Sequence, residues 1–70
     1  MDIKLVNHVF ELRKQKKITQ EELAEHIGVT RQTIIAIERG NYTPSVLLAL
    51  KIARFFQISV ETLFTIEYET

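Results

Sequence analysis

The sequence contains no cysteine and no tryptophan, and it has one proline and two glycines among 70 residues. Without cysteine the chain can form neither a disulfide framework nor a thiolate metal site, which is typical of a reducing compartment. No apolar run approaches the roughly 18 residues that a membrane span needs. The N-terminus also lacks the basic-then-apolar layout of a signal peptide. We therefore expect a cytoplasmic protein without covalent cross-links.

The residues that are present have the composition of a globular domain. Hydrophobic residues make up 46% of the chain and charged residues 26%, which is not a disordered composition. This length predicts one domain over residues 1–70. A single core of this size rarely supplies more than about 3–5 kcal/mol, so oligomerisation is a natural further source of buried surface.

The net charge is zero, with nine basic and nine acidic residues. Taken alone, this argues against nonspecific binding to a polyanion. The distribution is uneven, however, because basic residues occupy positions 13, 14, 16 and 17, and acidic residues follow at 21, 22 and 25. A neutral chain with this arrangement can still present a basic face.

Apolar spacing and capping residues predict five short helices, over about residues 7–16, 20–27, 31–38, 45–56 and 60–63. In the second helix, Thr19 and Glu22 have the spacing of a capping box. In the fourth, Thr43 precedes Pro44, which suits the first helical position. The expected N-caps are Asn7, Thr19, Thr30, Thr43 and Ser59.

Polar and apolar residues alternate at both ends of the chain, over residues 2–6 and 64–68. This period of two favours strands, although residues 2–6 could equally begin the first helix. A strand at 64–68 needs a partner for its backbone groups, and residues 2–6 are the only other strand-like segment. The predicted fold class is all-α, a five-helix bundle extended by a small two-stranded antiparallel sheet from the termini.

Residues 20–38 contain two helices of about eight residues, joined by Gly28, Val29 and Thr30. A joint of this length with glycine at its start makes two helices cross steeply, and Ala24 supplies a small residue at the crossing. A helix fits the major groove of B-DNA, where its N-terminal side chains can read base edges. The side chains expected on that outer face are Arg31, Gln32, Thr33 and Ala36.

The chain resembles the phage-repressor/Cro (Xre-like) helix-turn-helix family of transcriptional regulators over residues 7–64. The resemblance is carried by the two helices and their joint, and also by Ile37 to Gly40, Pro44-Ser45 and the run over 48–53. The resemblance implies a lambda-repressor-like bundle with its helix-turn-helix at 20–38. It implies a protein that binds double-stranded DNA, acts as a repressor and is not an enzyme. Compact repressors of the cytolysin-repressor type are similar in carrying a terminal sheet.

The resemblance also implies roles for individual residues. Arg31 suits guanine and Gln32 suits adenine, whereas Ala36 offers only a methyl group to thymine. An ion pair between Arg13 and Glu38 would link the helices at 7–16 and 31–38. The expected base contacts are Arg31, Gln32, Thr33 and Ala36, and the expected phosphate contacts are Thr19, Gln20, Thr30, Asn41, Tyr42 and Thr43.

Two positions depart from the family pattern, because Phe10 and Ile35 are apolar where many relatives are polar. Either residue could belong to a partner surface or lie under the terminal strands. If they were exposed and clustered, they would favour an alternative function, an antitoxin or another protein–protein interaction module with the same fold. Separately, 70 residues leave no room for an effector domain, so we expect regulation by a second protein or by concentration.

Enzyme and metal chemistry find little support. His8 and His26 have no third ligand at metal-binding spacing, and neither Ser45 nor Ser59 has a partnered histidine. We expect no cofactor and no metal.

One recognition helix covers too few base pairs for useful specificity in a genome. We therefore expect a homodimer on an inverted-repeat operator, formed through a C-terminal dimerisation segment at 59–70. The expected interface residues are Val60, Leu63, Phe64, Ile66 and Tyr68.

Overall fold

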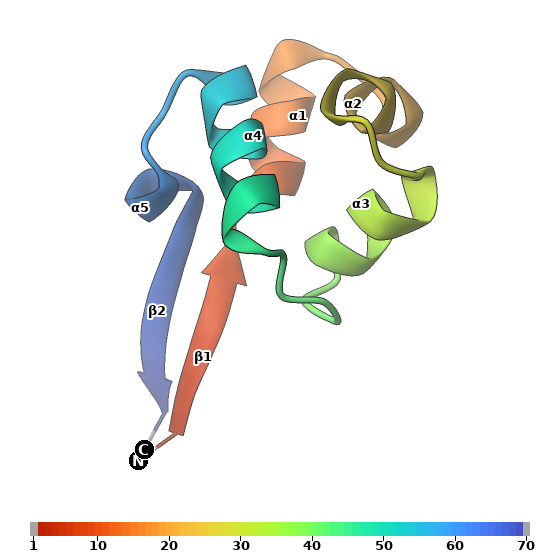
Figure 1. The fold of residues 1–70 in the computed structure, drawn as a ribbon. Coiled ribbons are helices and arrows are strands. Elements are labelled where there is room, and N and C mark those ends of the chain that lie inside the picture. The colour runs from red at the N-terminus through yellow and green to blue at the C-terminus, as the bar shows by residue number, and fades with distance from the viewer. Residues whose placement is uncertain (1, 70) are drawn as a thin grey trace.

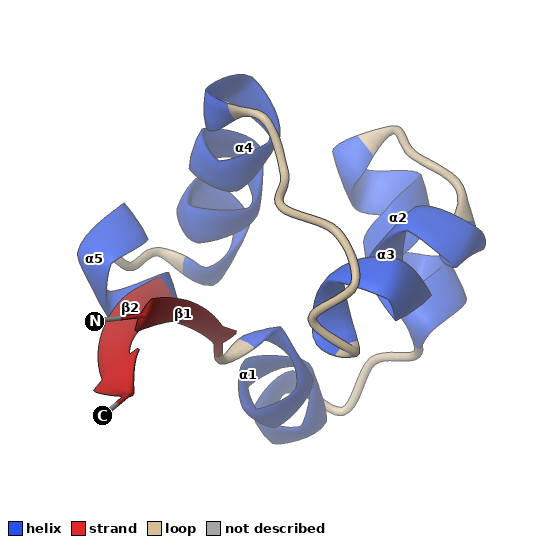
Figure 2. Ribbon diagram, turned by 90° about the horizontal axis from the view of Figure 1, so that it is seen from below, coloured by secondary structure: helices blue, strands red, loops and turns tan. Residues whose placement is uncertain are grey.

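The computed structural model describes residues 2–69. Within these residues, five helices form the body of the molecule and two strands form a sheet. The sheet projects from the body beside α5 and α1, away from α2 and α3 (Figures 1 and 2). The bundle and its terminal sheet are confirmed, although "all-α" is too narrow a class for a fold with two strands. The elements are β1 (Asp2–Asn7), α1 (Val9–Lys16), α2 (Gln20–Ile27), α3 (Arg31–Glu38), α4 (Val46–Phe56), α5 (Val60–Leu63) and β2 (Phe64–Glu69).

The start of α2 is fixed by a complete capping box. The Thr19 hydroxyl accepts a hydrogen bond from the Glu22 amide at 3.0 Å, and the Glu22 carboxylate accepts one from the Thr19 amide at 2.8 Å. The hydrogen bond from the Thr19 amide, and second the interaction with the Thr19 side chain, stabilise the charged carboxylate and so lower the pKa of Glu22. Because the pKa is lowered on folding, this stabilisation is present above the ordinary carboxyl pKa and is lost as the pH falls through the lowered one.

Two of the expected N-caps are wrong. Ser45, not Thr43, caps α4, because its hydroxyl accepts from the Leu48 amide at 3.1 Å and Pro44 lies outside the helix. At α1 the N-cap is His8, with no side-chain hydrogen bond. Asn7 instead ends β1, and its side-chain amide donates to the Ile37 carbonyl of α3 at 2.8 Å. The Asn7 Oδ1 atom still accepts a hydrogen bond from the Val9 amide, at the first residue of α1, at 3.2 Å, so Asn7 contacts the start of this helix from one position before its N-cap.

The core fills the space between the helices and is apolar. Leu63 belongs to it with no exposed surface, so the prediction that Leu63 meets a second copy of the chain is wrong. The four-residue α5 turns this side chain inward, beneath its own helices. The buried cluster is Val9, Leu23, Ala24, Ile27, Ile34, Ile37, Leu48, Ile52, Ala53, Phe56 and Leu63.

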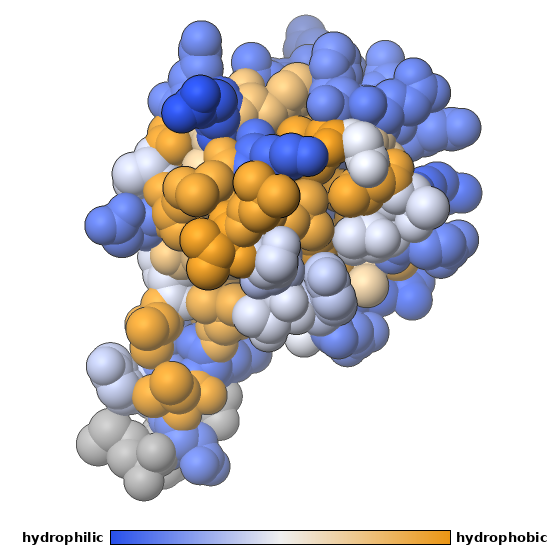
Figure 3. Space-filling view, viewed as in Figure 1, coloured by the Kyte–Doolittle hydropathy of each residue, from blue (hydrophilic) through white to orange (hydrophobic). Residues whose placement is uncertain are grey.

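The sheet is apolar on one face. The antiparallel register pairs Ile3 with Tyr68 and Leu5 with Ile66, and alternation places these two pairs on the same side. The orange side chains continue from the sheet across α4 (Figure 3). We call this exposed set the apolar face; it consists of Ile3, Leu5, Val46, Leu47, Leu50, Ile66 and Tyr68.

Two helices end on a non-glycine residue in the left-handed region, Lys17 with φ 59° and Gln57 with φ 60°. A side chain is disfavoured there, whereas glycine is not. We expect Gln57→Gly to raise the free energy of unfolding by about 0.5–1 kcal/mol, net of the added freedom of the unfolded chain. Chemical denaturation measures the change, with Gln57→Ala as the control. A Gly variant no more stable than the Ala variant would contradict this account.

Candidate nucleic-acid interface

A glycine turn joins α2 to α3. Gly28 has a φ of +86° and donates its amide to the Ala24 carbonyl at 2.8 Å, which ends α2. Thr30 then caps α3, because its hydroxyl accepts from the Thr33 amide at 3.3 Å. Ala24 of α2 and Ile34 of α3 are both buried in the core cluster. The opposite side of α3 is therefore left at the molecular surface.

The outer side of α3 carries the predicted base contacts. Arg31 and Gln32 are exposed at its N-terminal end, while Thr33 and Ala36 are half-buried. The Thr33 hydroxyl lies 3.2 Å from that of Thr30, so it belongs to the capped end of the helix. The exposed surface near the N-terminus is thus supplied chiefly by one guanidinium and one amide.

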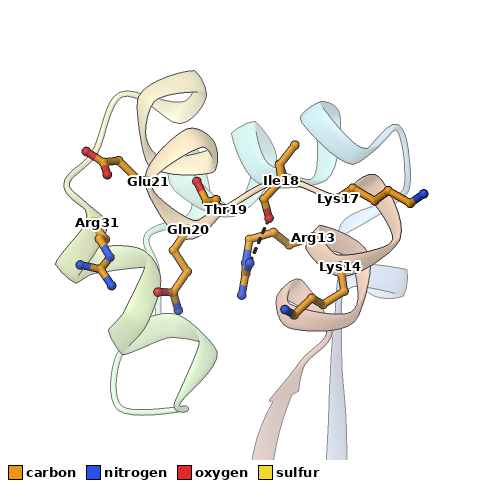
Figure 4. Close-up of a pocket in the computed structure, with 8 residues that line it drawn as sticks. All are labelled: Arg13, Lys14, Lys17, Ile18, Thr19, Gln20, Glu21 and Arg31. Atoms are coloured by element: carbon orange, nitrogen blue, oxygen red, sulfur yellow. Dashed lines mark hydrogen bonds between the residues drawn. The ribbon is translucent and has the colours of Figure 1, made fainter.

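A polar network ties the first three helices together. Arg13 Nε donates to Glu38 Oε2 at 2.8 Å and Arg13 Nη2 donates to Glu38 Oε1 at 3.2 Å, with both side chains over nine-tenths buried. Gln20 Nε2 also donates to Glu38 Oε1, at 3.1 Å. Arg13 Nη1 donates to the Ile18 carbonyl at 3.0 Å, just before α2 (Figure 4). The predicted ion-pair residues and the predicted phosphate-binding glutamine therefore meet in one cluster.

A groove of about 900 Å³ opens beside this network, between the end of α1 and the starts of α2 and α3 (Figure 4). Arg13, Lys14, Lys17 and Arg31 line it, with Glu21 as its acidic member. Gln20 projects into the space between Arg31 and Lys14. The cations at 13–17 predicted a basic face and left open whether one or two of them approach the DNA backbone. The structure places Arg13, Lys14 and Lys17 along this groove.

The loop after α3 lies at the other end of the helix. Gly40 has a φ of +78°, and the Asn41 amide donates to the Ala36 carbonyl at 2.9 Å. Asn41, Tyr42 and Thr43 follow as exposed residues. The predicted phosphate contacts are therefore divided between two places, with Thr19, Gln20 and Thr30 near the start of α3 and the loop residues near its end.

Other kinds of site have no counterpart in the part of the chain that the structure describes. No helix within residues 2–69 is long and apolar enough to cross a membrane. The same residues contain no group of three or more histidine or carboxylate side chains that could hold a metal ion.

Two short helices that cross at a glycine turn, with arginine and glutamine on the outer side of the second, define a helix-turn-helix protein. A family profile described as "Helix-turn-helix" matches residues 9–63. The chain belongs to the Xre-like helix-turn-helix family, a class of DNA-binding transcriptional regulators that are not enzymes.

Individual relatives agree with this assignment. The chain is 52% identical over 63 residues to the HTH-type transcriptional regulator YgzD of Bacillus subtilis (strain 168), which covers 90% of this chain and 96% of that protein. It is 34% identical over 53 residues to the CTXphi transcriptional repressor RstR of Vibrio cholerae, covering 76% and 48%. The restriction-modification controller protein C.AhdI of Aeromonas hydrophila is similar in structure, with a TM-score of 0.69, 34% identity, and coverage of 76% and 77%.

Proposed function

We propose that the protein is a sequence-specific repressor that binds an inverted-repeat operator as a homodimer, with α3 in the major groove. The observation that carries this proposal is the position of Arg31. It lies on the outer side of α3 and also lines the cationic groove. A helix placed with that side in the major groove brings Gln20 and Lys14 to the adjacent phosphates. The assignment as a repressor rests on likeness to RstR.

The two kinds of contact differ in what they contribute. Arg31 can donate two hydrogen bonds to the N7 and O6 atoms of guanine, and Gln32 can pair with the N6/N7 edge of adenine. Gln20 donates one amide hydrogen to Glu38, which leaves its second hydrogen for a phosphate oxygen. Phosphate contacts fix the register of the protein on DNA and carry no sequence information directly. Thr19, Thr30, Asn41, Tyr42 and Thr43 complete the proposed phosphate contacts.

Mutations at the two kinds of position should therefore behave differently. We expect Arg31→Ala and Gln32→Ala each to cost about 1–3 kcal/mol at the preferred site and to relax the choice of base there. Gln20→Ala should weaken binding about equally across sequences. Selection of duplexes from a random library, followed by mobility-shift titration at one salt concentration, measures both effects. A uniform loss for all three variants would refute the proposed role of α3.

The apolar face supports the homodimer. Val46 is 78% exposed and Leu47 is 65% exposed, and a two-stranded sheet alone is marginally stable in water. Contiguous apolar surface of this kind is typical of a protein interface. A cavity of about 220 Å³ lies between the sheet and α4, and Leu5, Leu50 and Phe64 are among the residues that line it.

The proposed interface therefore differs from the one predicted for segment 59–70. Ile66 and Tyr68 are exposed, and Val60 and Phe64 line the cavity, so all four remain in it. Leu63 leaves it because it is buried within its own chain. The α4 residues of the apolar face join it: Val46, Leu47 and Leu50.

The alternative function, a protein–protein interaction module, depends on Phe10 and Ile35 being exposed and clustered. Both residues line a single notch, so they do cluster. Arg31 and Arg39 line the same notch, together with Gln20 and with Glu38, whose charge is paired with Arg13. Two guanidiniums beside an apolar floor fit a polyanion better than they fit an apolar protein surface. This arrangement favours DNA as the partner of that side of the molecule.

A further inference from the structure

Ile35 occupies the middle of the outer side of α3. It follows Arg31 by four residues and precedes Arg39 by four, so the three side chains form one row along the helix. Arg31 and Arg39 are exposed and Ile35 is half-buried. Ile35 is also absent from the partly buried apolar side chains that pack against the core. Packing against the buried core therefore does not account for an isoleucine on this row.

The surroundings of Ile35 form a notch of about 340 Å³ between α1 and α3. Phe10, which is half exposed, supplies a second apolar side chain, and cations stack on its ring: Arg13 at 5.4 Å and Lys14 at 5.5 Å from the centroid. Arg31 and Arg39 also line the notch. Gln20 and Glu38 complete the lining, and Glu38 is paired with Arg13. The site therefore combines an apolar floor with a rim that carries two exposed guanidiniums.

This combination matches one feature of the major groove. DNA presents phosphates and polar base edges there, and its one apolar group is the methyl on C5 of thymine, which 5-methylcytosine also carries. A side chain that is apolar, faces the groove and lies between two arginines is suited to that methyl group. Ala36 lies on the flank of the row and reaches less far than Ile35.

We propose that Ile35 is a specificity-determining residue that contacts the C5-methyl group of a pyrimidine, next to the base read by Arg31. This inference rests on the proposed DNA-binding function and assigns a role to a residue that the helix-turn-helix resemblance left unexplained. It predicts that each half-site of the operator contains a pyrimidine with a C5-methyl group, which the protein recognises by apolar contact and not by a hydrogen bond.

The test removes the methyl group without altering any hydrogen bond. Each thymine in one half-site of the duplex selected by the wild-type protein is replaced by deoxyuridine, and affinity is measured for the wild type, Ile35→Ala and Ile35→Val. We expect one position at which deoxyuridine weakens wild-type binding about three- to fivefold. At that position Ile35→Ala should show almost no loss, and Ile35→Val should be intermediate. Ile35→Ala should fold normally, because Ile35 lies outside the core cluster.

A parallel series replaces each cytosine of the half-site by 5-methylcytosine and identifies the source of the methyl group. If 5-methylcytosine raises the affinity of the wild type but not that of Ile35→Ala, the methyl group belongs to 5-methylcytosine. If affinity changes only where deoxyuridine replaces thymine, the methyl group belongs to thymine. The inference fails if no single methyl change alters wild-type affinity, or if Ile35→Ala responds as strongly as the wild type. Failure of the proposed function would look different, since no duplex would then be enriched from the library.

Discussion

Replacing Arg13 by methionine is expected to lower the free energy of unfolding by about 3–5 kcal/mol, close to the whole stability that a core of this size supplies. Arg13 and Glu38 are both over nine-tenths buried. Without the guanidinium, the carboxylate would keep only the hydrogen bond from Gln20, which cannot compensate a buried charge. The variant should be largely unfolded near room temperature, which circular dichroism and urea titration would show.

Two further variants separate the ion pair from other effects of the substitution. Lys14→Met removes the neighbouring charge from an exposed position and should leave the unfolding midpoint nearly unchanged. The double variant Arg13→Met with Glu38→Leu removes both buried charges and should recover most of the lost stability, because a well-packed apolar pair can replace a buried ion pair. If Arg13→Met alone were as stable as the wild type, the pair would contribute little to folding.

The helix-turn-helix could be predicted almost to the residue because its signals are local. Thr19 and Thr30 cap their helices through bonds to residues three positions ahead, and Gly28 ends α2 through its own backbone conformation. Such interactions depend on sequence spacing alone. The bounds of α2, α3 and α5 are as the sequence predicts.

Errors arose where tertiary contacts decide the outcome. Two hydroxyl residues, Thr43 and Ser45, flank Pro44, and both can cap a helix; the structure uses Ser45. Leu63 lies in a four-residue helix followed directly by a strand, and so short an element has no apolar periodicity to show which side faces inward. Whether an apolar side chain packs inside its own chain or on a second one depends on the surrounding helices, which one sequence does not reveal.

In the candidate site, too, local features could be predicted from the sequence and contacts between helices could not. Arg31 and Gln32 could be placed on the outer side of α3 from helical geometry. The bond from Gln20 to Glu38 joins residues 18 positions apart, and the notch shared by Phe10 and Ile35 joins α1 to α3. Contacts between helices of this kind appear only when the packing of the bundle is known.

Introducing a charge into the apolar face is expected to separate the proposed dimer. Leu47 is 65% exposed on α4, so Leu47→Glu should leave the fold of one chain intact, while a second copy would have to bury an unpaired carboxylate. Each chain would then hold a single half-site. Affinity for the selected operator should fall by about 100-fold or more, the factor that linking two binding modules commonly provides. Sedimentation at micromolar concentration should show a dimer for the wild type and a monomer for the variant.

A covalent control distinguishes lost pairing from a damaged recognition helix. Two copies of the Leu47→Glu chain joined by a flexible linker need no interface to act together, so the fusion should recover most of the operator affinity. The unlinked variant should still prefer the half-site sequence over other DNA, because Arg31 and Gln32 are on α3 and Leu47 is on α4. A wild-type protein that sediments as a monomer, or a Leu47→Glu variant with full operator affinity, would refute the dimer and with it the inverted-repeat operator.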